Sequence, residues 1–231
     1  ILYRPFDVRW TVYDRNVAVH RRERAFDHFV SRPNLGLSMM RQASVDHGFS
    51  HVLAIDQIAD NRAQYSNRGV MAVSPLWLDQ DASADLLPRG RSGRSENFST
   101  LFRSELNRAV GSDPAAENVF AYIYAVLWSK SYRHRYSDFI KRDFPRVPLV
   151  SNRDVFSALV THGEELVSLH TMRVMPPRVT RFDVAGSNEV VKVRWADELP
   201  SQIGGQAGLG RVYINQEQYF GAVPLAVWEM H

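Results

Sequence analysis

The amino-acid sequence predicts an α+β protein with a β-rich N-terminal part, a central helical segment and a β-containing C-terminal part. Short apolar and aromatic segments precede residue 79 and recur after residue 178, while an unbroken apolar run occupies residues 119–128. No internal repeat is apparent. With 231 residues, 45% of them hydrophobic, the chain is long enough to bury a large core. We expect one domain over residues 1–231.

The N-terminal part is expected to hold several strands and one short helix. Apolar side chains alternate with polar ones from Phe6 to Val12, which predicts a strand over residues 3–13. A helix is predicted over residues 24–30, ended before Pro33. Further strands are predicted over residues 35–40, 51–58 and 70–78.

A long loop is predicted over residues 79–97. Its sequence, DQDASADLLPRGRSGRSEN, has no hydrophobic periodicity and is rich in Gly, Ser and Asp. Loops of this length are unusual within a compact domain, and they are typically functional or mobile. Three arginines, Arg89, Arg91 and Arg94, make this loop basic.

A central helical segment is predicted over residues 113–149. Asp113-Pro114-Ala115 is typical of a helix N-cap followed by proline in the first turn. The apolar run at residues 119–128 is shorter than the roughly 20 residues that a bilayer crossing needs. We therefore expect a helix that is buried on nearly all sides.

The composition changes abruptly after Trp128. Apolar side chains continue at helical spacing, whereas Lys and Arg occupy the other positions. A second helix is expected, capped by Ser129 or Ser131 and ended by Phe144-Pro145. The segment over residues 130–146 holds six of the 28 Lys and Arg residues.

The remaining elements flank this segment. A helix is predicted over residues 98–110 before it, and another over residues 154–169, interrupted by Gly163, after it. In the C-terminal part, strands are predicted over residues 179–184, 190–195 and 212–215, followed by a short helix over residues 216–220.

Composition limits the classes of function. The chain has no cysteine, which excludes disulfides and thiolate metal sites and suits a reducing compartment. No signal peptide or membrane-spanning run is found, so we expect a cytoplasmic location and no membrane partner. A net charge of +3 and a pI near 9.3 mildly favour anionic partners. Because the chain begins at Ile1 within an apolar segment, we expect it to be a piece of a longer protein.

No catalytic residue and no metal site is predicted. The glycines between residues 204 and 210 lack the following helix and lysine of a phosphate-binding loop. His47 and His51 are four residues apart, but Gly48 and Phe49 argue against a helix that would bring them together. His162 and His170 flank an apolar helical stripe and are predicted to be structural.

Three motifs follow one another in the central segment: FAYIYAVL at residues 120–127, YRHRY at 132–136 and DFPRVP at 143–148. Together they resemble the C-terminal specificity region of Type ISP restriction-modification enzymes and related adenine-specific DNA methyltransferases. The sequence departs from that family at SPLWL and HTM, where the family tends to have FPLYL and HLL, and both are tolerable packing changes. Further blocks that agree in order lie at residues 3–9, 34–37, 41–42, 164–170, 211–215 and 223–229.

The resemblance implies sequence-specific recognition of double-stranded DNA as part of a larger methyltransferase or restriction-modification enzyme. It implies an adenine-N6 methyltransferase domain in the same polypeptide, which binds S-adenosylmethionine and flips the adenine. A helicase-like motor and a nuclease further upstream are also compatible with it. This chain lacks the glycine-rich cofactor turn, and Ser74-Pro75-Leu76-Trp77 has leucine where the adenine-binding motif has a second proline.

A chain that recognises DNA needs cationic side chains for phosphates, and Arg, Gln or Asn for base edges. For each candidate the alternative is a solvated charge or an ion pair, and we expect about half of them to touch DNA. Phosphate contacts are predicted for Lys130, Arg133, Arg135, Lys141 and Arg142. Base contacts are predicted for Arg41, Gln42, Arg89, Arg91 and Arg94.

DNA recognition is the favoured interpretation, and other classes of function remain open. The chain is either the DNA-recognition part or a structural coupling module that packs on the methyltransferase domain and touches little DNA. One continuous basic groove favours recognition, whereas scattered charges favour coupling. An independent enzyme is a third and weaker alternative, because cofactor and nucleophile motifs are missing.

Overall fold

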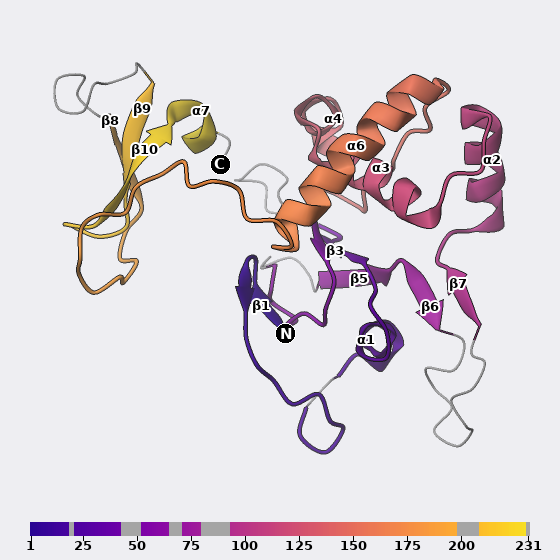
Figure 1. Ribbon diagram of the computed structural model, residues 1–231, viewed down its shortest axis with the longest axis horizontal. Helices are drawn as coiled ribbons and strands as arrows, with labels where there is room; N and C mark the ends of the chain where they lie inside the picture. Colours follow the sequence, from indigo (N-terminus) through magenta and orange to yellow (C-terminus); the bar gives the residue numbers. More distant parts are fainter. Residues whose placement is uncertain (19–20, 43–51, 65–70, 80–92, 198–207, 230–231) are drawn as a thin grey trace. The chain divides into compact units, whose positions relative to one another are not determined.

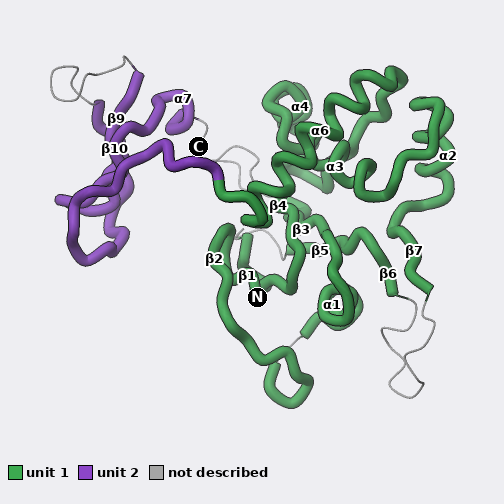
Figure 2. Tube along the Cα trace, in the orientation of Figure 1, with its two compact units in different colours: residues 1–175 green, residues 176–231 purple. Residues whose placement is uncertain are grey.

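The computed structural model describes residues 1–18, 21–42, 52–64, 71–79, 93–197 and 208–229 (Figure 1). Within these ranges, strands gather in several small antiparallel sheets before and after a run of five helices, and this segregation confirms the α+β class. The chain divides into two compact units, residues 1–175 and residues 176–231 (Figure 2). The single domain expected over residues 1–231 stays a prediction. None of the helices in the described ranges combines the length and apolarity that a membrane crossing requires.

A three-stranded antiparallel sheet forms the β-part of the first unit. Its central strand β3 (Gly36–Met40) pairs with β4 (Val52–Ile55) on one side and β5 (Met71–Pro75) on the other. All of β4 is buried, and its alternate residues enter two different cores. Val52 and Ala54 face the helices, whereas Leu53 and Ile55 pack with Phe26 and Phe29 of α1 (Glu23–Val30). Both faces of the sheet are therefore covered.

Three strand predictions are refined by this sheet. The strands predicted over 35–40 and 51–58 are confirmed as β3 and β4, with β4 shorter than expected. The strand predicted over 70–78 is two strands, β5 and β6 (Trp77–Asp79), and β6 pairs with β7 (Arg94–Glu96). The loop predicted over 79–97 was therefore wrong at residues 94–96, and residues 80–92 lie outside the described ranges.

The single strand predicted over residues 3–13 was wrong. The chain instead forms a hairpin of β1 (Leu2–Arg4) and β2 (Asp7–Val8). The turn between them is Pro5-Phe6, and Phe6 has φ of 64°. Proline at the second turn position followed by a left-handed residue is the pattern of a type II turn. Alternation of apolar residues did not reveal this reversal.

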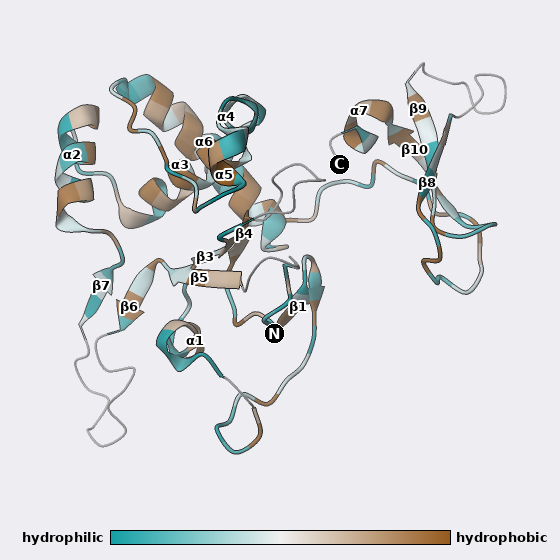
Figure 3. Cartoon of the chain, turned by 180° about the vertical axis from the view of Figure 1, so that it is seen from behind, coloured by the Kyte–Doolittle hydropathy of each residue, from teal (hydrophilic) through white to brown (hydrophobic). Residues whose placement is uncertain are grey.

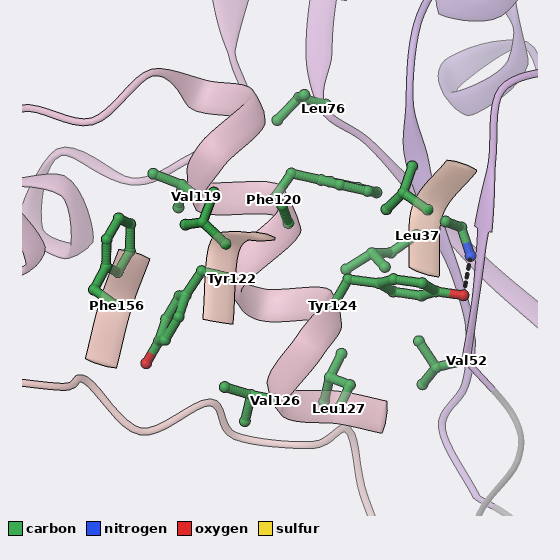
Figure 4. Packing of buried hydrophobic residues seen from close by; sticks show 14 of the residues in the cluster. Leu37, Val52, Leu76, Val119, Phe120, Tyr122, Tyr124, Val126, Leu127 and Phe156 are labelled. Atoms are coloured by element: carbon green, nitrogen blue, oxygen red, sulfur yellow. Dashed lines mark hydrogen bonds between the residues drawn. The ribbon is translucent and has the colours of Figure 1, made fainter. Parts of the chain in front are cut away.

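The described part of the first unit holds five further helices: α2 (Thr100–Val110), α3 (Ala116–Trp128), α4 (Lys130–Arg135), α5 (Ser137–Ile140) and α6 (Arg153–His170). The core is built around α3, whose Val119, Tyr122, Tyr124 and Leu127 are almost completely buried (Figure 4). The burial on nearly all sides predicted for this helix is confirmed. A Cβ at Gly163 would lie 1.9 Å from the carbonyl oxygen of Ala121, so glycine is required where α6 crosses α3.

The ends of these helices differ in part from the predictions. Ala115, not Asp113, is the N-cap of α3, because the Asp113 carboxylate accepts hydrogen bonds from Arg103 and Asn107 instead. Ser129 caps α4 by accepting from the Tyr132 amide at 3.3 Å, as one of the two predictions had it. The second central helix is two short helices, α4 and α5, which meet at Tyr136.

The second unit contains an antiparallel sheet in the order β10-β9-β8, formed by β8 (Arg194–Asp197), β9 (Leu209–Tyr213) and β10 (Tyr219–Pro224), and the short helix α7 (Leu225–Trp228). The strands predicted over 190–195 and 212–215 were right only in part, because each shares two residues with β8 or β9 and the remaining residues of each prediction are not in a strand. The strand over 179–184 was wrong, since only Arg181 forms a bridge there.

The helix predicted over residues 216–220 was also wrong. The side chain of Asn215 accepts from the amides of Glu217 and Gln218 and thereby forms a turn. Gln218, which directly precedes β10, is buried and hydrogen-bonds to Val184, Asn188 and Asn215. These hydrogen bonds fix the position at which β10 begins.

Candidate nucleic-acid interface

The basic segment after α3 is anchored by two tyrosines. Tyr132 and Ile140 are its buried residues, whereas Lys130, Arg135 and Arg142 are exposed. The Tyr132 hydroxyl donates to the Arg146 carbonyl at 2.8 Å, and the Tyr122 hydroxyl of α3 donates to the Pro148 carbonyl. Figure 3 shows that α4 is mostly hydrophilic, whereas much of α6 is apolar.

These two hydrogen bonds explain why the three central motifs occur together. A tyrosine from FAYIYAVL and a tyrosine from YRHRY each hold a backbone carbonyl of DFPRVP. Residues 141–150 have no helix or strand of their own and take their path from these contacts. The motifs therefore describe one folded unit, in which a buried side positions an exposed basic side.

Residues about 100 positions apart in the sequence meet at one corner of the first unit. Arg41 and Gln42 follow β3, and they reach the chain that follows α5. The Arg41 Nε lies 3.1 Å from the Asp143 carboxylate, and Gln42 donates to the Arg142 carbonyl at 3.5 Å. We call Arg41, Gln42, Lys141, Arg142 and Asp143 the basic corner. Predicted base contacts and predicted phosphate contacts thus lie side by side in it.

Asp143 is the one acidic member of the basic corner, and neighbouring groups stabilise its negative charge. Its carboxylate accepts from the Phe144 amide at 2.9 Å and from Arg41. These hydrogen bonds, first that of Phe144 and then that of Arg41, lower the pKa of Asp143. Asp143 therefore orients the Arg41 guanidinium while leaving the corner with a net positive charge.

Arg133 is turned inward, unlike the exposed Lys130 and Arg135. Its Nε donates to the Leu127 carbonyl at 2.7 Å, and its guanidinium lies 4.2 Å from the centre of the Trp128 ring. Burial lowers the pKa of Arg133. A cation at the last carbonyls of a helix stabilises that end, so these contacts give Arg133 a structural role at the end of α3. Its predicted phosphate contact stays a prediction.

Arg94 is also held by internal contacts. It donates to the Pro33 carbonyl at 2.8 Å, lies 3.8 Å from Asp79 and stacks over Trp77 at 5.3 Å. These contacts fasten β7 beside β6. Arg89 and Arg91, predicted with Arg94 to contact bases, lie outside the described ranges. The base contact of Arg94 stays a prediction.

A part-buried polar pair that the sequence did not reveal joins the helices to the sheet. The Tyr124 hydroxyl lies 2.5 Å from Nδ1 of His170 and accepts from the Ala54 amide at 3.1 Å. Burial raises the pKa of Tyr124 and lowers the pKa of His170, so both are neutral near pH 7 and the hydroxyl donates to the imidazole. The ring of Trp128 lies 4.5 Å from that of His170. The structural role predicted for His170 agrees with these contacts.

No group of three histidine, aspartate or glutamate side chains within the described ranges is arranged to hold a metal ion. Within the first unit, the described residues bring together an aromatic core and a basic corner. These features define an α+β module whose buried aromatic side chains support an exposed cationic segment.

The chain belongs to the family of Type ISP C-terminal specificity domains, whose model matches residues 1–231. The family that the three motifs indicated is therefore confirmed. No curated protein matches the chain.

Two solved structures share its fold. One is described as a cryoEM structure of a DrdV–DNA complex, with a TM-score of 0.69, 19% identity and 99% of this chain covered. The other is a nuclease-deletion mutant of the Type ISP restriction-modification enzyme LlaGI in complex with a DNA substrate mimic, with a TM-score of 0.51, 21% identity and 87% covered. This chain corresponds to 22% and 16% of those two chains.

Proposed function

We propose that this chain recognises a specific sequence in double-stranded DNA as the specificity domain of a restriction-modification enzyme. The observation that carries the proposal is the basic corner, in which Arg41 and Gln42 meet Lys141 and Arg142. Arg and Gln are suited to bidentate contacts with guanine and adenine, whereas Lys and Arg neutralise phosphates. Membership of a specificity-domain family and the two DNA complexes among the similar folds support it.

The proposal extends to a larger polypeptide. The two similar structures are chains several times longer than this one. An adenine-N6 methyltransferase domain in the same polypeptide would bind S-adenosylmethionine and flip the target base, while this chain sets the register along the duplex. In this scheme the cationic side chains of the chain bind and orient DNA, and none of them takes part in methyl transfer.

A coupling module is the second candidate, and one observation favours it. Phe6, Val8, Trp10 and Val12 are all exposed, and Trp10 is 102% exposed. Groups of exposed apolar side chains often mark a protein interface. In that case the N-terminal segment packs on the rest of the polypeptide, which is compatible with DNA recognition elsewhere on the chain.

Selection from a pool of duplexes with a randomised core tests DNA recognition. The chain is incubated with the pool, and the bound DNA is sequenced. We expect one motif to be enriched, and the double variant Lys141→Gln/Arg142→Gln to bind every duplex more weakly, with a log–log salt slope lower by about 1.8. The control is Arg108→Gln, an exposed arginine of α2 that pairs with Glu105.

The outcomes separate the two candidate functions. Enrichment of a motif together with loss of affinity in the double variant supports recognition. Binding without any enriched motif, or no binding at all, rejects it. If Trp10→Ser but not the double variant disturbs the assembled enzyme, the coupling module is the better description.

A further inference from the structure

The sheet of the second unit carries two arginines and two tyrosines together on one face. Arg194 of β8 is directly opposite Tyr213 of β9, and Tyr213 is opposite Tyr219 of β10. Arg211 lies two residues before Tyr213, so its side chain is on the same face. These four residues, which we call the Arg–Tyr row, come from three strands.

Within the row, each guanidinium is stacked on an aromatic ring. Arg194 lies 3.8 Å from the centre of the Tyr213 ring, and Arg211 lies 4.6 Å from that of Tyr219. The two tyrosine rings are 5.1 Å apart. Stacking restricts the long arginine side chains, so their planar donor groups are arranged before any ligand binds.

The opposite face of the sheet is used for packing within the unit. Trp195 stacks on Trp228 of α7 at 5.8 Å, and Phe220 packs on Phe182 at 4.7 Å. A Cβ at Gly210 would lie 2.1 Å from the Trp195 ring, so glycine is needed for this packing. The Arg–Tyr row therefore lies on the face that is not needed for the unit's own core.

Charge is segregated between the two faces. Asp197 is the acidic residue in the three strands, and it alternates to the Trp195 face, where it accepts from the indole nitrogen at 3.0 Å. Beside the row is a concavity of about 600 Å³ lined in part by Lys192, Arg194 and Asn215, with Glu217 also on its wall. The described strand residues on the row face thus carry two positive charges and no negative one.

This combination fits the sugar-phosphate backbone of DNA. Arginine forks match phosphate oxygens, and a cationic surface is attracted to a polyanion. Single-strand binding proteins instead leave aromatic faces open for unstacked bases. Here arginines lie over both tyrosine rings, so the surface suits phosphates and not exposed bases.

We propose that the Arg–Tyr row is a second DNA contact, in which Arg194 and Arg211 bind phosphates of the duplex independently of base sequence. The proposal rests on the function proposed above, and in it the second unit increases the affinity for DNA. The basic corner supplies discrimination in this scheme.

Salt titration of binding tests the row. The complete chain is titrated with two labelled duplexes, the motif enriched in the selection and a scrambled version, and with the scrambled single strand. Losing two phosphate contacts lowers the log–log salt slope by about 1.8, which weakens binding about 60-fold near 0.1 M salt. We expect this for Arg194→Gln/Arg211→Gln on both duplexes, with their affinity ratio unchanged.

Two further variants distinguish the loss of specific phosphate contacts from a general loss of positive charge and from misfolding of the chain. Arg178→Gln/Arg181→Gln removes the same charge from exposed positions of the same unit outside the strands, and we expect a slope change well below that of the row variant. Arg194→Lys/Arg211→Lys keeps the charge without the planar fork, and we expect the slope to recover with affinity only partly restored.

Each outcome bears on the proposal. An unchanged slope in the row variant overturns it while leaving DNA recognition intact, provided that the unaltered chain still selects its motif. Equal losses in the row and control variants, or a loss confined to single strands, also overturn it. If the unaltered chain binds no duplex, both proposals fall together.

Discussion

Helix α3 and the basic segment that follows it both contain aromatic side chains, but most of α3 is buried and most of the basic segment is exposed. Nine of the thirteen residues of α3 are buried, whereas α4 and α5 each bury only one. In α3 the aromatic side chains fill the core. In the basic segment, Tyr132 and Ile140 are anchors that hold an otherwise exposed, cationic chain in place. A fixed basic surface here depends on a few buried contacts and not on extensive burial.

The largest effect that separates the two regions is on stability. Leu127 lies in α3 with 1% of its surface exposed, so Leu127→Ala leaves a cavity and is expected to lower the free energy of unfolding by about 2–5 kcal/mol. Leu101 of α2 is 72% exposed, and Leu101→Ala should change it by less than about 0.5 kcal/mol. Chemical denaturation measures both. Equal effects would show that α3 is not the centre of the core.

The sequence allowed the buried helix and the three-stranded sheet of the first unit to be predicted, because hydrophobic periodicity reports burial directly. Tight turns were missed. Asn215 replaced a predicted helix by a turn, and Pro5-Phe6 divided a predicted strand into a hairpin. Such reversals depend on one or two residues, which a periodicity of several residues does not detect.

The basic residues of the candidate site could be predicted from the sequence, but which of them lie side by side could not. The basic residues of the central segment were evident, yet nothing in the sequence placed Arg41 beside Asp143, 102 residues away. Nor did it distinguish Arg133 from Arg135, since both occupy the same short motif. Their difference arises from the turn at Ser129, after which Arg133 reaches back to the Leu127 carbonyl.

Arg133 and Arg135 provide an intermediate test of the comparison. Arg133→Ala removes a charged hydrogen bond and a stacked cation from the end of α3, and we expect a loss of about 1–3 kcal/mol in the free energy of unfolding. Arg135 is exposed, so Arg135→Ala should change stability by less than about 0.5 kcal/mol. In DNA titrations Arg135→Ala is expected to lower the salt slope by about 0.9. The opposite pattern would mean that Arg133 faces DNA.

The smallest expected effect concerns pH and the pair of Tyr124 and His170. Burial lowers the pKa of His170 below its ordinary value of 6.5, so the unfolded chain binds a proton at this position more readily than the folded one. Its contribution to stability is therefore complete above about pH 6.5 and is lost as the pH falls through the folded pKa. Protonation also removes the acceptor that Nδ1 offers to the Tyr124 hydroxyl.

Unfolding measured across pH 5–8 for the unaltered chain, His170→Gln and His162→Gln isolates this contribution. His162 lies on the exposed side of the same helix, with 70% of its side chain exposed, and serves as the matched control. We expect the His162 variant to follow the unaltered chain, and the His170 variant to be less stable near pH 8 but to lose less stability toward pH 5. Parallel curves for all three proteins would mean that His170 does not sense pH. The hydrogen bonds of Tyr124 to Ala54 and His170 would then contribute equally at every pH in this range.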